Sequence, residues 1–95
     1  MSLPRPALER SKVEVDDAVF EIRSLTRAEA AACQRLVERE AAWDELEIAV
    51  IAAGTETPAD EVRAWYADVP SHVAEAVFNA IRVLSRIDEG AQKSG

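Results

Sequence analysis

Residues 25–54 read LTRAEAAACQRLVEREAAWDELEIAVIAAG, and this stretch decides the fold of the chain. Thr26 and Glu29 form a T-x-x-E capping box, in which the hydroxyl accepts from a first-turn N–H and the carboxylate accepts from the N–H of the cap. The interior has no Gly or Pro and is rich in Ala, Leu, Glu and Arg, so its helix propensity is high. Gly54 can adopt the left-handed conformation that ends a helix. The stretch therefore predicts one long helix of about 27 residues, roughly 40 Å in length.

The apolar residues of this stretch recur at helical spacing. Leu36, Trp43 and Val50 are seven residues apart, and other apolar side chains widen the surface on one flank. Carboxylates fall near the middle of that width, where an unpaired buried charge is costly. Two interpretations follow. The helix bends or breaks near Glu38–Glu40, so that its halves bury different faces, or one side of the surface faces the core and the other a partner. The flanking apolar residues are Val37, Ile48 and Ile51, and the carboxylates are Glu29, Glu40 and Glu47.

A short β-hairpin is expected before this helix. Two segments with β-like composition, Val13–Val15 and Ala18–Arg23, are separated by Asp16 and Asp17, which favour a turn. A lone hairpin is marginally stable in water, so this one must pack on the helices. The side chains expected to point inward are Val13, Val15, Phe20 and Ile22.

Two further helices are expected in the C-terminal half. A short one starts at Pro58, which suits the first helical position, and runs to about Ala67. A second runs from about Ser71 to Asp88 and stops at Gly90. Its apolar stripe is the clearest in the chain. The short helix presents Val62, Trp65 and Tyr66 on one face, and the stripe of the second comprises Val73, Val77, Ile81, Leu84 and Ile87.

Together these elements predict one small, mainly helical α+β domain over residues 13–90. A flexible arm is expected at residues 1–12 and a frayed tail at residues 91–95. Val50, Ile81 and similar apolar residues on the long helix and the last helix are expected to form the core. The predicted core comprises Trp43, Val50, Val77, Ile81 and Leu84.

Composition limits the kinds of partner. The chain has 95 residues, with 18 acids against 11 bases and a net charge of −7, which disfavours nucleic acid and anionic membranes. No apolar run approaches the ~18–20 residues of a membrane helix, and no signal peptide is recognisable, so a cytoplasmic protein is expected. Only two Trp, two Phe and one Tyr are present, which predicts a thin core. A protein partner or self-association as a homo-oligomer would complete the burial.

No motif predicts catalysis, a metal site or a cofactor. Cys33 is the only cysteine, so an internal disulfide is excluded, and we expect it to act as a buried small hydrophobe. Ser71 and His72 diverge by about 100° on a helix and make a poor catalytic pair; His72 is expected to be solvated. One Cys, one His and scattered carboxylates do not match zinc or calcium patterns, and the separated glycines exclude a phosphate loop. A non-enzymatic protein without metal or cofactor is expected.

Two stretches carry a resemblance to a known family. Residues 22–29 read IRSLTRAE, and residues 81–86 read IRVLSR. They resemble the I/V-R-x-L-T-x-x-E and I-x-x-L-S-G patterns of the tail assembly chaperones of long-tailed bacteriophages. Arg86 stands where that family often has Gly. The order of hairpin, long helix, Pro-started helix and amphipathic helix is also similar, and the resemblance covers roughly residues 13–93.

The resemblance implies a non-enzymatic role in the cytoplasm of the host cell. Members of this family coat the helical tape measure protein and keep it soluble while tail tube subunits polymerise around it, and many also exist as a longer form made by ribosomal frameshifting. The implied partner is the tape measure protein, with tail tube subunits as a further candidate. The residues expected to contact a partner, from the surplus apolar surface, are Val37, Ile48, Ile51, Trp65 and Tyr66.

The alternative function belongs to another class. A small acidic inhibitor of the anti-restriction or anti-CRISPR type occludes a nucleic-acid-binding site by its charge. Such an inhibitor concentrates its acids on one face, whereas arginines interrupt the acids along this chain. The chaperone is therefore the favoured hypothesis.

Overall fold

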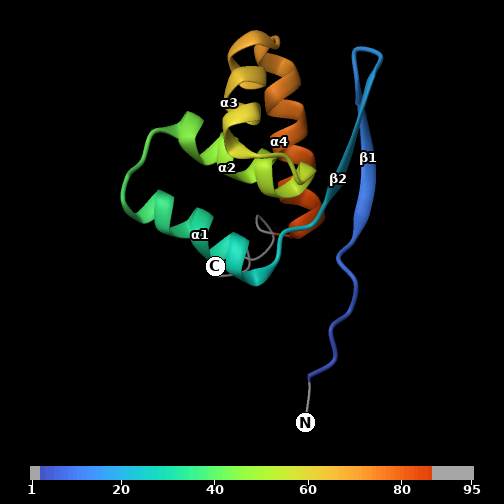
Figure 1. Cartoon of the computed structure of the whole chain (residues 1–95), viewed down its shortest axis with the longest axis vertical. Helices are drawn as coiled ribbons and strands as arrows, with labels where there is room; N and C mark the ends of the chain where they lie inside the picture. The colour runs from blue at the N-terminus through green and yellow to red at the C-terminus, as the bar shows by residue number, and fades with distance from the viewer. Residues whose placement is uncertain (1–2, 87–95) are drawn as a thin grey trace.

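The computed structural model describes residues 3–86, which form an antiparallel hairpin followed by four helices (Figure 1). This arrangement confirms the predicted fold class, a mainly helical α+β domain with an N-terminal hairpin. It differs from the prediction in having two helices where one long helix was expected. The elements are β1 (Arg10–Val15), β2 (Ala18–Arg23), α1 (Arg27–Glu38), α2 (Trp43–Thr55), α3 (Ala59–Asp68) and α4 (Ser71–Ser85).

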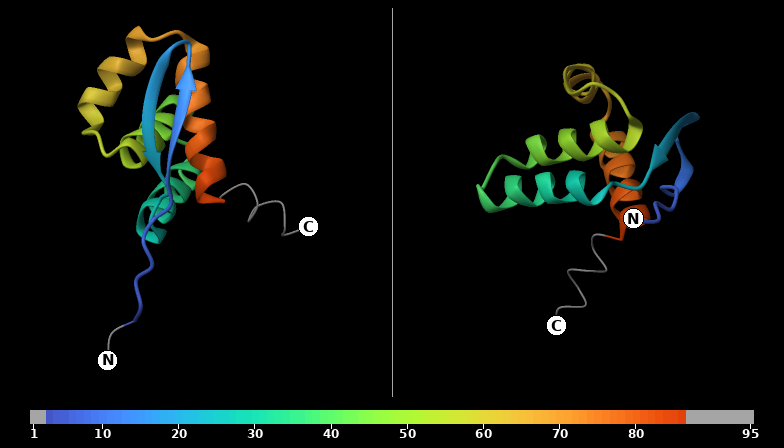
Figure 2. Two further views of the ribbon diagram at one scale, coloured as in Figure 1. Left: turned by 90° about the vertical axis from the view of Figure 1, so that its right-hand side faces the viewer. Right: turned by 60° about the horizontal axis from the view of Figure 1, so that its bottom comes forward.

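The hairpin turns at the two aspartates, as predicted. Asp16 and Asp17 have φ values of 51° and 70°, and two successive positive φ angles are the mark of a type I′ turn, which matches the twist of the strands. Val13 lies opposite Phe20 in the register, and both are half-buried. Ile22 is fully buried. The inner face of the hairpin packs on α2 and α4, and Figure 2 shows it lying alongside α4.

The first strand begins earlier than predicted. Arg10, Ser11 and Lys12 pair with Arg23, Ile22 and Glu21. These three residues were assigned to the arm, which is therefore shorter than residues 1–12. Residues 3–9 form no helix or strand. Glu9 still hydrogen-bonds to Ser24, and the residues before it extend away from the helices in Figure 1.

The break near Glu38–Glu40, one of the two interpretations, is confirmed, and the single long helix is wrong. The N–H of Glu40 donates to the carbonyl of Val37 and that of Ala41 to the carbonyl of Leu36, both at 3.0 Å. With Glu40 at a φ of 57°, these bonds form a Schellman motif that satisfies the last carbonyls of α1. The chain then folds back, and α1 and α2 lie side by side (Figure 2). Each half thus buries a face of the other.

Gly54 has a different role from the predicted one. It lies inside α2, which ends at Thr55 and is capped by Glu56, a residue with a φ of 58°. A Cβ atom on Gly54 would lie 2.4 Å from Cδ1 of Ile81 on α4. The absence of a side chain therefore lets α2 and α4 approach closely, as glycine does where two backbones cross.

The core lies around α2, which packs against α1, α3, α4 and β2. The most deeply buried large side chains are Val50, Val77, Phe78 and Ile81. Leu84, also predicted for the core, is half-buried and packs against it. Trp43 was predicted for the core as well, but its exposed fraction is 60%. As the first residue of α2, it lies next to the break and at the edge of the core.

The bounds of the last two helices are close to those predicted. α3 begins at Ala59, one residue after Pro58. α4 ends at Ser85, because Arg86 adopts a φ of 63°. The prediction had continued this helix to Asp88 with a stop at Gly90. Both of those residues and the tail at 91–95 lie outside the described residues.

A buried cation ties the hairpin to the helices. Arg23 is 8% exposed, and two of its nitrogens donate to the two carboxylate oxygens of Glu29 at 2.9 Å. Its Nε lies 3.2 Å from Glu56 Oε2, in ion-pair contact but without hydrogen-bond geometry. Glu29 also completes the predicted capping box with Thr26. The hydrogen bonds from Arg23 are the main reason that the pKa of Glu29 falls to about 2. Glu29 is thus a paired charge on a wide apolar surface.

Candidate functional site

An apolar cleft lies where α1, α2 and α4 meet, and we call it the Trp43 cleft. It encloses about 170 Å³. It opens beside the break between α1 and α2, with Val37 from the last turn of α1 and Trp43 from the first turn of α2 in its lining. Its lining residues are Ala30, Cys33, Gln34 and Val37 from α1, Trp43, Leu46 and Val50 from α2, and Phe78 and Arg82 from α4.

Large apolar side chains stand exposed at the rim of this cleft. Val37 is 51% exposed and Trp43 is 60% exposed, one on each side of the break. The indole contacts the ring of Phe78 edge-on, with 5.5 Å between ring centroids. The guanidinium of Arg82 lies 5.1 Å from the same centroid. The buried lining residues, Cys33, Val50 and Phe78, are apolar. The cleft can therefore bind apolar side chains of another molecule.

A second hollow lies on the other side of Trp43, and we call it the Glu47 pocket. It encloses about 370 Å³. Acidic, hydroxyl and aromatic groups line it, and no Lys or Arg does. The lining residues are Trp43, Glu47, Tyr66, Val69, Ser71, Ala74 and Glu75.

Glu47 is the buried charge of this pocket, with an exposed fraction of 7%. The hydroxyl of Tyr66 donates to Oε1 of Glu47. This hydrogen bond to a carboxylate, together with burial of the phenol, raises the pKa of Tyr66 to about 12. Glu47 was one of the three carboxylates that fell within the predicted apolar surface. The structure places it beside α3, where Tyr66 satisfies one of its oxygens.

The predicted contact residues divide into surface and core positions. Val37 lies at the rim of the Trp43 cleft, and Tyr66 lines the Glu47 pocket. Trp65 is half-buried, with its ring edge-on to Phe20 at 5.8 Å between centroids. Ile48 and Ile51 are 3% and 2% exposed, so their assignment to a partner surface is wrong. Both belong to the hydrophobic core, where α2 packs against α3, α4 and β2.

Trp43 is the exposed residue of the cleft that the sequence did not reveal. Its seven-residue spacing with Leu36 and Val50 indicated the core. The signal that could have identified it is its place just after the acidic stretch at Glu38–Glu40, because a residue that follows a helix break lies at the edge of the packing.

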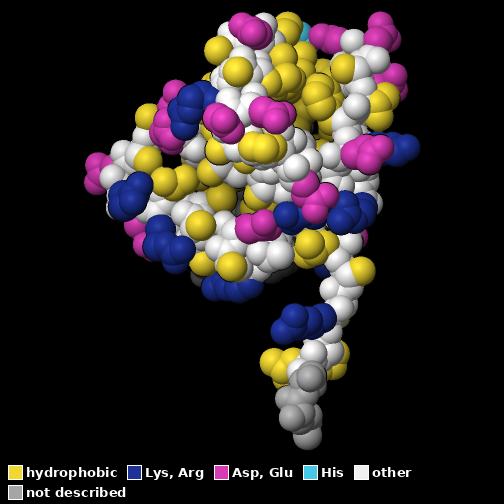
Figure 3. Space-filling model, in the orientation of Figure 1, with side chains coloured by type: hydrophobic (Ala, Val, Ile, Leu, Met, Phe, Trp, Pro, Cys, Tyr) yellow, Lys and Arg dark blue, Asp and Glu magenta, His cyan; other side chains and the backbone are white. Residues whose placement is uncertain are grey.

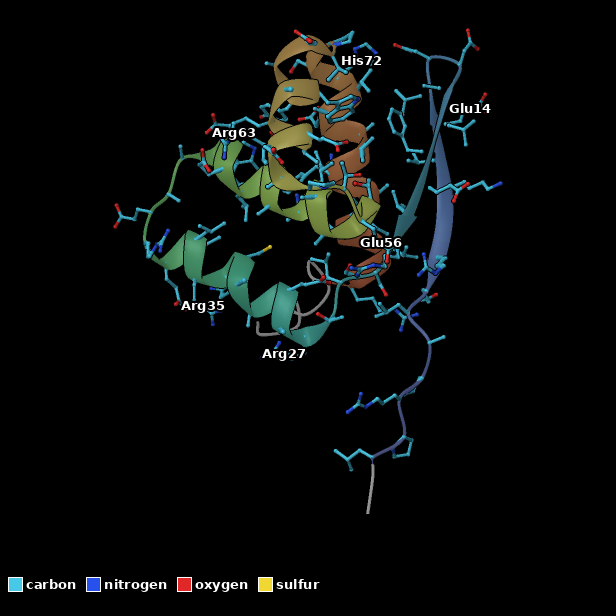
Figure 4. The ribbon with its side chains drawn as sticks, viewed as in Figure 1. Glu14, Arg27, Arg35, Glu56, Arg63 and His72 are labelled. Carbon is cyan, nitrogen blue, oxygen red and sulfur yellow. The ribbon has the colours of Figure 1, made fainter. Side chains whose placement is uncertain are left out.

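The single cysteine and the single histidine lie in different parts of the fold. Cys33 is buried, as predicted, and burial is the main cause that raises the pKa of its thiol. His72 is exposed and contacts Asp16, near the tip of the hairpin (Figure 4). Among residues 3–86, no group of three or more His, Cys, Asp or Glu side chains is placed to hold a metal ion. Within the same residues, no helix has the length and apolar character needed to cross a membrane.

Charges of both signs are spread over the surface. In Figure 3, acidic and basic side chains are interleaved, with hydrophobic side chains visible between them. Arg27 and Arg35 project from α1 on one side of the molecule, and Glu14 lies on the hairpin (Figure 4). Arg63 forms a two-pronged ion pair with Glu45 at 2.9 and 3.2 Å. On the face that Figure 3 shows, the acids do not form a single patch.

Comparisons with protein-family models, with curated proteins and with solved structures find no match to this chain. The functional argument therefore depends on the surface itself and on the residues that carry the resemblance.

Proposed function

We propose that this protein is a non-enzymatic tail assembly chaperone, which binds a helical segment of a tape measure protein and keeps it soluble during tail tube assembly. The observation that carries the proposal is the exposure of Trp43 and Val37 around an apolar cleft. A cleft of about 170 Å³ is too small for a whole helix. It suits the side chains that project from one face of a helix, which is how grooves receive amphipathic helices.

The exposed tryptophan can supply much of the binding energy. At 60% exposure, Trp43 leaves roughly 150 Å² in contact with water, taking its full surface as about 250 Å². Covering that area is worth up to about 4 kcal/mol at 25 cal/mol per Å². Tryptophans that a partner buries in this way are frequent hot spots of interfaces. A chaperone that binds an apolar helix reversibly would use such a residue.

The residues of the resemblance have a common structural role, which also supports the proposal. Residues 22–29 supply the buried Ile22 and the Arg23–Glu29 pair. The N–H of Leu25 donates to the hydroxyl of Ser85 at 2.8 Å, so the first stretch and residues 81–86 are in direct contact. The two sequence patterns therefore belong to one contact region, where the hairpin, α1 and α4 meet. A shared pattern of this kind is what a shared fold would require.

The test is co-expression of the chain with the tape measure protein that the proposal expects to be encoded downstream of its gene, followed by pull-down. We expect the downstream protein to be soluble only when this chain is present. Val37→Gln should weaken the complex, because it places a polar amide at the rim of the Trp43 cleft. Val83→Gln is the matched control, since Val83 is also an exposed helical valine but lies outside the cleft.

Two results would contradict the proposal. One is a downstream protein that is equally soluble alone and forms no complex at low salt. The other is equal binding by the Val37 and Val83 variants, which would place the partner elsewhere. If the chain instead bound a nuclease or a surveillance complex and blocked its DNA, the inhibitor function would replace the chaperone function.

A further inference from the structure

We propose that the Glu47 pocket receives a cationic side chain, Arg or Lys, from the partner segment that fills the Trp43 cleft. The inference rests on the proposed function, because the cation is taken to come from that same partner. It adds the chemistry of the segment: an apolar side chain followed, at helical spacing, by a base.

The first observation is a buried carboxylate without a counter-charge. Glu47 is 7% exposed, and no Lys, Arg or His of residues 3–86 forms an ion pair with it. Tyr66 hydrogen-bonds to Oε1, and Oε2 is not a buried atom left without a hydrogen-bond partner, because Arg23 Nε is the one such side-chain atom among these residues. A hydroxyl satisfies one lone pair but does not neutralise the charge. A carboxylate with so little exposed surface and no counter-charge keeps few contacts with water, and a cation in the pocket would pair with it.

The second observation is the composition of the pocket walls. Trp43 forms one wall, and an indole face attracts a guanidinium or ammonium group. Glu75 is exposed on the same lining and adds a second negative charge. The nearby Arg63 is already held by Glu45 at 2.9 and 3.2 Å. A pocket of about 370 Å³ with an aromatic wall and two carboxylates therefore fits a basic side chain from outside.

Trp43 connects the two hollows, since it lines both. Residues three or four apart on a helix are neighbours on one face, with their Cβ atoms about 5–6 Å apart. A single partner helix can therefore place an apolar side chain in the Trp43 cleft and a base in the Glu47 pocket. The base would also fix the direction of the segment and so favour one binding register.

A small probe tests the pocket without the partner. n-Butylguanidinium carries the head group of arginine, and n-butylurea is a neutral analogue of similar shape. With eight heavy atoms, the cation is expected to bind with a dissociation constant on the order of 1 mM. At constant ionic strength, n-butylguanidinium should shift the NMR signal of the Trp43 indole N–H in a saturable way, and n-butylurea should not. The signal is assigned with Trp43→Phe.

Three variants locate the effect. Glu47→Gln keeps a hydrogen-bond acceptor for Tyr66 but removes the negative charge. It should weaken the binding of n-butylguanidinium by at least about tenfold. Glu75→Gln should weaken the binding of n-butylguanidinium by about threefold. Because Glu75 is exposed, this variant tests the pocket even if Glu47→Gln disturbs folding. Glu14→Gln removes one charge on the hairpin, outside the pocket, and should leave binding unchanged (Figure 4).

Equal shifts from the cation and the urea would overturn the inference, as would unchanged binding by both the Glu47 and the Glu75 variants. The outcome is separable from the test of the proposed function. Loss of the co-expression complex with retained guanidinium binding would refute the chaperone and leave the cation pocket intact. An intact complex with no discrimination between the two probes would refute the pocket alone.

Discussion

Replacing Gly54 with Ala tests the contact that sets the distance between α2 and α4. The added Cβ would lie 2.4, 2.7 and 2.8 Å from Cδ1, Cγ1 and Cγ2 of Ile81. All three distances are shorter than real Cβ contacts, so something must shift. Ile81 has no exposed surface and cannot move into solvent. The strain must therefore be absorbed by the packing of the two helices.

Two opposing effects set the magnitude. Overpacking a core by one carbon typically costs 1–3 kcal/mol, roughly. Ala in place of Gly inside a helix stabilises the folded state by about 0.5–1 kcal/mol. We expect the clash to dominate, with a net loss of about 1 kcal/mol. For a domain of this size, that loss lowers the melting temperature by roughly 4–8 °C.

Urea and thermal unfolding followed by circular dichroism measure this loss, and a double-mutant cycle identifies its cause. Ile81→Ala alone should cost about 2–5 kcal/mol through the cavity that it leaves. In the double variant Gly54→Ala/Ile81→Ala, the new methyl group occupies part of that cavity. The double variant should then be more stable than the sum of the single losses by about 1–2 kcal/mol. A higher melting temperature for Gly54→Ala, or strict additivity in the cycle, would refute the close contact.

Two further predictions concern ionisable groups. Because the pKa of Glu29 is about 2, below its ordinary value, the Arg23–Glu29 pair stabilises the fold above about pH 4.5 and less as the pH falls towards 2. Glu29→Gln should cost roughly 1–3 kcal/mol at pH 7 and flatten the acid side of the stability profile, which urea unfolding between pH 3 and 7 would measure. Tyr66 is the only tyrosine, and its pKa of about 12 lies above the ordinary value. Its hydrogen bond to Glu47 therefore stabilises the fold fully below about pH 10, and this stabilisation is lost as the pH rises towards 12. Absorbance titration of the phenolate should show this late midpoint in the wild type and an earlier one in Glu47→Gln; equal midpoints would rule out the Tyr66–Glu47 hydrogen bond.

Local signals predicted most of the elements correctly. The capping box of Thr26 and Glu29 starts α1, and the two aspartates at 16 and 17 form the turn of the hairpin. The apolar stripe of α4 faces the core through Val77 and Ile81. Each of these features depends on residues close in sequence, whose hydrogen bonds or periodicity can be read directly.

The ends of α1, α2 and α4 followed a different rule from the one used for prediction. Glycine was taken as the residue that ends a helix, at positions 54 and 90. In the structure, Glu40, Glu56 and Arg86 take the left-handed conformation instead. A side chain in that region costs about 1 kcal/mol, and only contacts formed elsewhere in the fold can offset it. The sequence around these residues carries no local mark of that compensation.

The candidate site depended on these helix ends. Val37 was predicted at the partner surface and lies at the rim of the cleft, whereas Ile48 and Ile51 were predicted there and lie in the core. Trp43 was predicted in the core and lies at the surface. A stripe at helical spacing shows which side chains share a face, but not what covers that face.

The sequence by itself determined the hairpin, the start of α1, the extent of α3 and the buried stripe of α4, because short-range hydrogen bonds and periodicity specify them. Only the tertiary structure decided that α1 and α2 fold back on each other at Glu40. That turn leaves Trp43 exposed at the start of α2, and the packing of α2 on α3, α4 and β2 buries Ile48 and Ile51 and brings Glu47 to Tyr66. The physical reason is that burial is a property of the whole packed chain. The free energy gained when two helices cover each other outweighs the local cost of one left-handed residue.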